Sequence, residues 1–239
     1  MSDFKSKLVR KKQIAEGTMA FYLEKPKDFS FVAGQHATFQ IAKPKETDAE
    51  GDSRTFSFIT IPSGNEVGFA SRMRDSAFKR NLKGAGLGLE IDIKNPRGSM
   101  VLPQDLRRPL VFLAGGIGIT PFMSMIRQAS YEKSAQKIFL FYSNRTVAQT
   151  AFLADLRQLA KENENFNFIP FITQEKLSTW QGELGYISEE AVKKYVPKIG
   201  ETLFYLAGPT GMVSAMSELL ASMGVDSLFI KSEDYGEYK

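Results

Sequence analysis

The stretch Pro109-Leu-Val-Phe-Leu-Ala-Gly-Gly-Ile-Gly-Ile-Thr-Pro121 decides the fold of this chain. Its apolar run, Leu110 to Ala114, leads into closely spaced glycines, and Thr120 and Pro121 then open an apolar-periodic segment. This order predicts a buried strand, a tight glycine turn and a helix, with Thr120 as the N-cap and Pro121 in the first turn. Such a turn offers backbone N–H groups and a helix N-terminus to an anion, most often a phosphate.

Beyond this stretch, apolar strands alternate with helical patterns. The strand candidates are Leu110–Ala114, Ile138–Tyr142, Phe166–Ile172, Leu203–Ala207 and Leu228–Ile230. They are apolar without alternation, as in a parallel sheet that is covered on both faces. Helical stripes lie between them; one is expected to end at Gly224 and another to begin at Ser188. Residues 106–239 therefore predict a doubly wound α/β domain.

Residues 1–105 are rich in β-strand patterns. The strand candidates are Lys7–Ala15, Thr18–Lys25, Ala37–Ile41, Arg54–Ile61, Val67–Met73 and Glu90–Lys94. Turn residues separate them, and only Ser76–Leu82 resembles a short helix, so we expect a six-stranded antiparallel barrel. The basic run from Lys5 to Lys12 is interpreted as a solvated edge strand.

Composition excludes several kinds of function. The chain has 239 residues, a net charge of +4, no cysteine and a single histidine, His36. Without cysteine it has no disulfide, thiol nucleophile or Cys-ligated zinc or iron–sulfur site, and we expect no metal site. The charge is too mild to indicate nucleic-acid binding. We find neither a signal peptide nor an apolar run long enough to span a membrane, and therefore expect a cytoplasmic protein.

A second glycine turn follows the strand candidate at Leu203, in Leu206-Ala-Gly-Pro-Thr-Gly-Met212. In an open α/β sheet, ligands bind at the carboxyl ends of strands where the strand order reverses. The two turns could therefore flank one ligand, although each taken alone is also compatible with a plain strand–helix connection. The first turn matches neither the dinucleotide motif G-x-G-x-x-G nor the phosphate-loop motif.

Two stretches of the β-rich half carry candidate binding residues. In Arg54-Thr-Phe-Ser57, the guanidinium could hold a phosphate, Phe56 could pack on a flat ring and Ser57 could donate to a heterocycle nitrogen. In Arg72-Met-Arg-Asp-Ser76, the serine is a candidate N-cap of a helix whose N-terminus would face an anion. Capping alone, or an ordinary surface strand, would also explain these residues.

In this order, the four stretches resemble the ferredoxin–NADP reductase family over roughly residues 5 to 238. Arg54–Ser57 is similar to its flavin motif Arg-x-Tyr-Ser, and Ser76 to the serine of Gly-x-x-Ser, with Met73 in place of the glycine. Gly115–Pro121 resembles its pyrophosphate loop and Ala207-Gly-Pro209 its Cys-Gly-Pro motif.

The resemblance implies a flavin-binding barrel, a nucleotide-binding α/β domain, and hydride transfer from NAD(P)H to bound FAD, with FMN as the alternative flavin. The residues that it assigns to catalysis are Ser57, Glu233 and Tyr238. Those that it assigns to cofactor binding are Arg54, Thr55, Phe56, Ser57, Arg72, Met73, Ser76, Gly115, Gly116, Gly118, Thr120, Pro121, Arg145, Ala207, Gly208, Pro209 and Tyr235. Tyr235 or Tyr238 is expected to lie near the flavin ring.

The sequence differs from the family pattern at two further motif positions, and these differences change the expected activity. Phe56 replaces the motif tyrosine, and Ala207 replaces a cysteine near the nicotinamide, which predicts slower or less selective transfer. No iron–sulfur domain is expected, so electrons would pass to a separate acceptor: ferredoxin, flavodoxin, an oxygenase component, free flavin or a ferric chelate. A cation near the adenine ribose would favour NADPH, for which Arg145 and Lys176 are candidates, yet Thr173-Gln174 favours NADH slightly.

Two other functions stay open. One is a regulatory module that binds flavin or nucleotide but has lost turnover, which Phe56 and Ala207 would favour. The other is a non-redox enzyme with Ser57 or Ser214 as nucleophile, although neither serine lies in a G-x-S-x-G elbow. The sequence does not indicate the oligomeric state.

Overall fold

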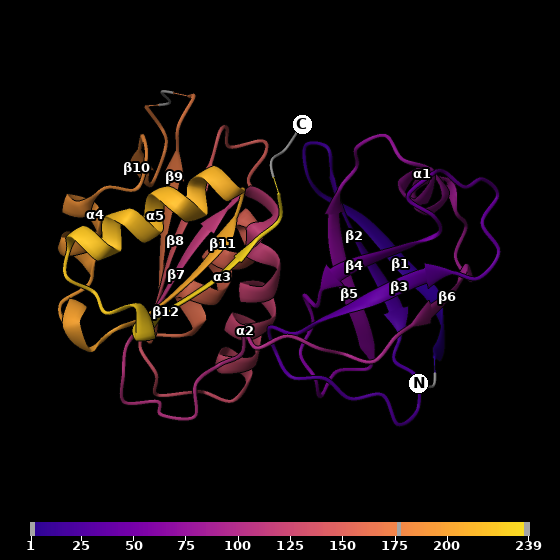
Figure 1. Ribbon diagram of the computed structural model, residues 1–239, viewed down its shortest axis with the longest axis horizontal. Helices are drawn as coiled ribbons and strands as arrows, with labels where there is room; N and C mark the ends of the chain where they lie inside the picture. Colours follow the sequence, from indigo (N-terminus) through magenta and orange to yellow (C-terminus); the bar gives the residue numbers. More distant parts are fainter. Residues whose placement is uncertain (1–2, 176–177, 237–239) are drawn as a thin grey trace.

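The computed structural model describes residues 3–175 and 178–236. It contains two six-stranded sheets, one in each half of the chain, which lie side by side (Figure 1). The N-terminal sheet is antiparallel and the C-terminal sheet is parallel, as the sequence predicts. Residues 94–109 connect the sheets, and we keep the predicted domain boundary, 105/106, within this connection.

The N-terminal sheet has the strand order β4-β3-β6-β1-β2-β5. Its strands are β1 (Phe4–Ala15), β2 (Thr18–Glu24), β3 (His36–Ile41), β4 (Ser53–Ser57), β5 (Glu66–Arg72) and β6 (Glu90–Ile93). The two outer strands meet because Phe58, directly after β4, bridges to Phe69 on β5 and the Ile59 amide donates to the Gly68 carbonyl at 2.9 Å. This contact closes the sheet into the expected barrel.

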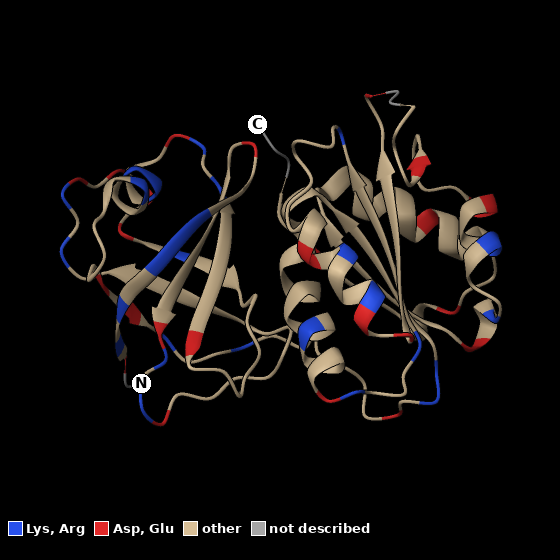
Figure 2. Cartoon of the chain, turned by 180° about the vertical axis from the view of Figure 1, so that it is seen from behind, with Lys and Arg blue, Asp and Glu red and all other residues tan. Residues whose placement is uncertain are grey.

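Phenylalanines fill the barrel. Phe21, Phe39, Phe58 and Phe69 are fully buried, and the rings of Phe39 and Phe69 lie 4.5 Å apart. Because alternate residues of a strand point to opposite faces, the intervening positions of β1 carry its basic residues, visible as a blue run in Figure 2. β1 is not an edge strand as interpreted, because it lies between β6, which pairs with residues 4–7, and β2, which pairs with residues 8–15.

The C-terminal sheet has the order β10-β9-β8-β7-β11-β12. Its strands are β7 (Leu110–Gly115), β8 (Ile138–Asn144), β9 (Phe166–Ile172), β10 (Glu183–Leu184), β11 (Leu203–Gly208) and β12 (Ile230–Asp234). After β7 the chain continues to β8 on one side, and β11 occupies the other side. The strand order therefore reverses between β7 and β11, where a ligand site is expected.

Helices cover both faces of this sheet. α2 (Ile119–Tyr131) and α3 (Leu153–Glu162) share a core with one face, and α4 (Glu189–Tyr195) and α5 (Thr210–Ser222) share a core with the other. The barrel carries a single α-helix, α1 (Ala77–Gly84), among the described residues. As predicted, Ser188 caps α4 and Gly224, with a φ of +77°, follows the end of α5.

Three sequence expectations are corrected, and the first concerns the predicted strand Arg54–Ile61, because β4 ends at Ser57. The last strand begins at Ile230, since residues 227–229 form a 3₁₀ turn with Leu228 85% exposed. A 3₁₀ turn over Gly116–Gly118 precedes α2, so Gly118 holds the capping position. Thr120 is not the N-cap, because its hydroxyl donates back to the Ile117 carbonyl at 3.0 Å.

The two halves pack through a shared apolar core and two polar ties. The core includes Ala20 and Tyr22 of β2 together with residues of α2. From α2, the Ser124 hydroxyl donates to the Thr60 carbonyl at 2.6 Å, and Arg127 Nη1 donates to the Ile59 carbonyl at 2.5 Å. Among the described residues, no helix has the length and apolar character that crossing a membrane requires.

Candidate functional site

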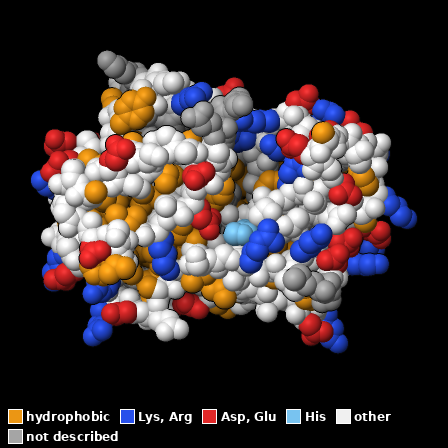
Figure 3. All heavy atoms as spheres, in the orientation of Figure 1, with side chains coloured by type: hydrophobic (Ala, Val, Ile, Leu, Met, Phe, Trp, Pro, Cys, Tyr) orange, Lys and Arg blue, Asp and Glu red, His pale blue; other side chains and the backbone are white. Residues whose placement is uncertain are grey.

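A cavity of about 540 Å³ lies where the barrel meets the glycine turns. Figure 3 shows the hollow between the halves, with the single histidine, His36, at its rim. The barrel contributes the ends of β4 and β5 and the start of α1, the other half contributes Ile117 and Thr120, and β12 with its following residue supplies the remaining wall. The cavity therefore brings together three stretches that the sequence analysis singled out.

Ser57 and Tyr235 meet inside this cavity. Ser57 is buried at the end of β4, and its hydroxyl lies 3.2 Å from the Tyr235 hydroxyl. The Tyr235 amide donates to the Gly208 carbonyl at 3.1 Å, which fixes the tail to the second glycine turn. Of the two tyrosines expected near the flavin ring, Tyr235 lines this cavity, whereas Tyr238 lies outside the described residues.

Glu233 and His36 form the rim. Glu233 Oε1 and His36 Nδ1 are 4.0 Å apart, and the Tyr235 hydroxyl lies 3.4 Å from Glu233 Oε2. Burial raises the pKa of Glu233, only partly offset by Tyr235, and burial together with Arg97 lowers the pKa of His36. Both shifts favour the neutral forms, and the contacts join Tyr235, Glu233 and His36 into one series of polar groups at the rim.

A group of cations lines one end of the cavity: Arg72, Arg74 and Lys79. Lys79 is half-buried on α1, and its burial, followed by the neighbouring charges of Arg74 and Arg54, lowers its pKa. A concentration of positive charge in a partly desolvated cavity suits an anionic ligand group such as a phosphate.

Arg54 does not line the cavity as the described residues define it. Its Nη1 donates to the carbonyls of Glu50, Gly51 and Ser53 at 2.9, 3.1 and 2.7 Å. Its Nη2 is 2.7 Å from Glu50 Oε2 and 3.5 Å from Asp48 Oδ1. The guanidinium is therefore engaged by the preceding loop, which the sequence motif alone did not predict.

Some of the remaining barrel candidates line the cavity, and others pack in the barrel core or cap α1. Thr55 and Phe56 line the cavity, and the Phe56 ring stacks on Phe69 at 4.6 Å. Met73 instead packs against the barrel core. Ser76 is the N-cap of α1 and accepts from the Lys79 amide at 3.4 Å, which matches the capping interpretation.

The glycine turns need glycine because backbones approach closely there. A Cβ on Gly118 would lie 2.1 Å from the Ala207 carbonyl oxygen, and one on Gly208 would lie 3.2 Å from Gly115 Cα. Gly116 has a φ of +54°, and a Cβ there would lie 2.7 Å from Arg72 Nη2. The turn thus packs against the second turn on one side and a barrel arginine on the other.

The other predicted residues of the α/β half surround these turns. Thr120 lines the cavity, Pro121 is buried in the first turn of α2, and Pro209 caps α5. Ala207 is fully buried and pairs with β7 and β12. Arg145 is exposed just beyond the carboxyl end of β8, and Lys176 lies outside the described residues.

This arrangement fits a flavin beside a dinucleotide. The small side chains of Ala70 and Ser71 leave one wall of the cavity open to a flat ring, and the cations stand at one end of it. The bare backbone of Gly115, Gly116 and Gly118 at the head of α2 suits a pyrophosphate at the switch in strand order.

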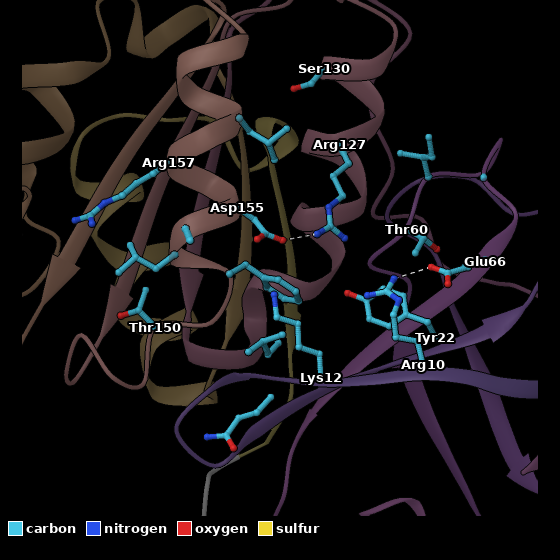
Figure 4. A pocket seen from close by; sticks show the side chains of 18 of the residues that line it. Arg10, Lys12, Tyr22, Thr60, Glu66, Arg127, Ser130, Thr150, Asp155 and Arg157 are labelled. Carbon is cyan, nitrogen blue, oxygen red and sulfur yellow. Dashed lines mark hydrogen bonds and ion pairs between the residues drawn. The ribbon is translucent and has the colours of Figure 1, made fainter. Parts of the chain in front are cut away.

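A second, larger hollow of about 1070 Å³ lies between β1, β2, α2 and α3. Figure 4 shows two ion pairs in it: Arg10 with Glu66 and Arg127 with Asp155. It contains neither the glycine turns nor the β4 motif. We therefore place the candidate active site in the smaller cavity.

Comparisons with known proteins agree with this geometry. Residues 112–218 match the family model of the oxidoreductase NAD-binding domain. The anthranilate 1,2-dioxygenase electron transfer component of Acinetobacter baylyi is 29% identical, over 93% of this chain and 64% of its own length. The ferredoxin NADP⁺ reductase of Neisseria gonorrhoeae, solved with FAD and NADP, superposes with a TM-score of 0.80 at 20% identity, covering 98% of this chain and 99% of that one. The α/β half is thus similar to the oxidoreductase NAD-binding domain, and the whole chain shares the fold of the Neisseria reductase.

Two further proteins are similar to this chain over most of its length. NADH-cytochrome b5 reductase 1 of Aspergillus terreus is 26% identical over 93% of this chain and 79% of its own length. The FAD/NAD-binding domain of nitric oxide dioxygenase from Vibrio cholerae has a TM-score of 0.86 at 17% identity, covering 99% of this chain and all of that one. The chain spans just under two thirds of the length of the Acinetobacter relative.

Sequence reasoning did not predict seven of the residues that line the cavity: His36, Ala70, Ser71, Arg74, Lys79, Ile117 and Asp234. Arg74 was detectable, since it stands two positions from Arg72 near a strand end. Lys79 was not, because facing the cavity depends on how α1 docks on the barrel.

Proposed function

We propose that this protein takes electrons from NAD(P)H onto a bound flavin and passes them to a separate acceptor. The observation that carries the proposal is the cavity in which Ser57, the tail residue Tyr235 and the first glycine turn converge from distant parts of the chain. The barrel, residues 1–105, would bind the flavin, and residues 106–239 would bind the nicotinamide dinucleotide. FAD is the preferred flavin and FMN the alternative.

The chain's own residues would bind and orient both cofactors. Phe56, backed by Phe69, and the small residues of β5 would border the flavin ring, and the cations at the end of the cavity would face its phosphate. Gly115 to Pro121, with Gly208 and Pro209, would hold the pyrophosphate and place the nicotinamide near Thr120. Because residue 207 is alanine, no thiol would lie near the nicotinamide. A bound flavin accepts a hydride and can release electrons singly.

Proton transfer would involve Ser57, Glu233 and the C-terminal tail. The contacts from Ser57 through Tyr235 and Glu233 to His36 run from the buried end of β4 to the rim. A proton held at the Ser57 hydroxyl can therefore exchange along side chains without opening the cavity to water. Tyr238 stays a catalytic candidate from the sequence.

NADH is the slightly preferred donor. Support comes from the Thr173-Gln174 pair and from the relative named NADH-cytochrome b5 reductase 1. Arg145 is exposed at the edge where the adenine ribose would lie and stays a candidate for recognising a 2′-phosphate. The acceptor is proposed to be a separate carrier, of which an acidic protein is one kind; the Acinetobacter relative is named as a dioxygenase electron transfer component.

The test is a flavin titration of the purified protein followed by anaerobic addition of NADH or NADPH. We expect flavin to bind and its visible absorbance to bleach, faster with NADH. Protein that binds neither FAD nor FMN would refute the proposal. Flavin binding without bleaching would instead support a module that has lost turnover, the alternative that Phe56 and Ala207 favour.

A further inference from the structure

Lys79 is the unusual cation of the cavity. Its ammonium makes no hydrogen bond or ion pair with any residue of the ranges 3–175 and 178–236, although the residue is half-buried. Neighbouring Arg74 and Arg54 repel it, and the more weakly acting Glu50 attracts it. A partly desolvated charge beside like charges is costly unless an anion joins it, so the position of Lys79 points to a negatively charged ligand group.

Arg54, the cation that the family motif assigns to the flavin phosphate, is neutralised by the chain itself. The loop before β4 surrounds its guanidinium with three carbonyls and the carboxylates of Asp48 and Glu50. For Arg54 to bind a phosphate fully, these contacts would have to be exchanged. A phosphate should therefore bind more favourably to cations that are not already held by the loop before β4.

The Asp48 carboxylate occupies the N-terminus of α1, where an anionic ligand group could otherwise bind. Its Oδ2 accepts from the Ala77 amide at 2.7 Å, and this bond, together with Arg54, holds the pKa of Asp48 below its usual range. The loop is anchored nearby, because Glu46 forms two hydrogen bonds with Arg80 at 2.9 and 2.7 Å and accepts from Asn81 at its backbone carbonyl. The helix end thus carries a fixed negative charge beside the cavity.

We propose that Lys79 is the principal cation for the phosphate of the flavin and that Asp48 opposes that phosphate from the N-terminus of α1. This inference rests on the proposed flavin function. It assigns phosphate binding to a residue outside both flavin motifs, and it makes the affinity for phosphorylated flavins a balance between Lys79 and an internal carboxylate.

The experiment compares riboflavin, FMN and FAD, because riboflavin has the same ring and no phosphate. Dissociation constants are measured by quenching of flavin fluorescence for the wild type, Lys79→Gln, Lys79→Arg and Lys83→Gln. Lys83 is the matched control, since it lies one turn further along α1 and is exposed. Unfolding curves in the absence of flavin confirm that each variant is folded.

Lys79→Gln should weaken FMN and FAD binding by roughly 10- to 100-fold, the usual loss for a hydrogen bond to a charged group. Riboflavin binding should stay unchanged, Lys79→Arg should restore most of the affinity, and Lys83→Gln should behave as the wild type. Equal losses for riboflavin and FMN, or equal effects of Lys79→Gln and Lys83→Gln, would overturn the assignment. A wild type that binds none of the three flavins would refute the proposed function instead.

Asp48→Asn tests the opposing charge. It keeps an oxygen that can accept from the Ala77 amide but removes the negative charge. FMN and FAD should bind about 2- to 10-fold more tightly, as expected from removing a like charge at a partly exposed site, and riboflavin should be unaffected. Weaker FMN binding would show that Asp48 supports the phosphate site and would overturn this half of the proposal.

Discussion

At the scale of single residues, Gly118 shows how closely the two glycine turns approach. Because its Cβ would lie 2.1 Å from the Ala207 carbonyl oxygen, backbone must move to admit a methyl group. Gly118→Ala should destabilise the protein by about 1–3 kcal/mol, measured by urea unfolding. Gly211→Ala is the control: it lies in α5 with no atom within 4 Å of its Cβ, so alanine should be neutral or stabilising by up to ~1 kcal/mol. Equal stabilities for the two variants would contradict the close approach.

Glu233 should make stability depend on pH. Because burial raises its pKa above the usual 4.5, the folded protein keeps a proton that the unfolded chain releases, and this contribution to stability falls as pH rises from 4.5 through the raised value. His36 acts in the opposite direction below pH 6.5, since its pKa is lowered.

The measurement is urea unfolding at a series of pH values for the wild type and Glu233→Gln. The variant keeps His36 and loses only the carboxyl titration, so its stability relative to the wild type should rise across the window above pH 4.5. A constant difference between the two proteins at all pH values would show that Glu233 titrates alike in both states.

The sequence could identify Ser57 and Tyr235 as site residues because both lie at fixed positions in recognisable motifs. It did not predict the hydrogen-bond partners of Arg54 and Thr120, because these are set by local loop geometry: three backbone carbonyls for the arginine and the Ile117 carbonyl for the threonine. A side chain's nearest acceptor cannot be read from spacing when the backbone between them has no regular period.

At the scale of elements, hydrophobic periodicity located most strands to within a residue or two. The exceptions are instructive. β1 begins three residues before its predicted start, and β4 ends four residues before its predicted end. β10 has two residues, too few to show a period, and β12 is displaced from its apolar run because Leu228 turns outward in a 3₁₀ turn. The polar residues of β12 join the sheet as an edge strand beside β11, where most of its positions face solvent.

Arg127 joins three elements, and its loss should loosen them. From α2 it donates to the Ile59 carbonyl beyond β4 and to Asp155 of α3 at 2.8 Å. Arg127→Met should cost about 1–3 kcal/mol, because a carbonyl and a carboxylate lose a charged donor. Asp155→Asn should cost only about 0.2–1 kcal/mol, since the Asp155 side chain is 45% exposed and that of Arg127 20%. Equal losses in urea unfolding would show that the tie to the barrel contributes little.

At the scale of the whole molecule, the division into a barrel and a doubly wound sheet was predictable, because the two halves have different hydrophobic periods. Their relative placement was not. It depends on contacts such as Ser124 with Thr60 and on the shared core of β2 and α2, which join residues far apart in the sequence. The cavity forms only when the two halves pack in this way. The sequence therefore did not indicate that His36 and Lys79 line it.

A flavin in this cavity should couple the two halves. The walls come from β5 and α1 on one side and from the head of α2 and β12 on the other, so a bound flavin gains contacts only while both halves are folded. At a free concentration one hundred times the dissociation constant, FAD should stabilise the protein by about 2.7 kcal/mol. Hydrogen exchange should then slow in β5 and also at the start of α2. Protection confined to the barrel would show that the flavin binds one half alone, and the α/β half would then meet it only when the nicotinamide dinucleotide arrives.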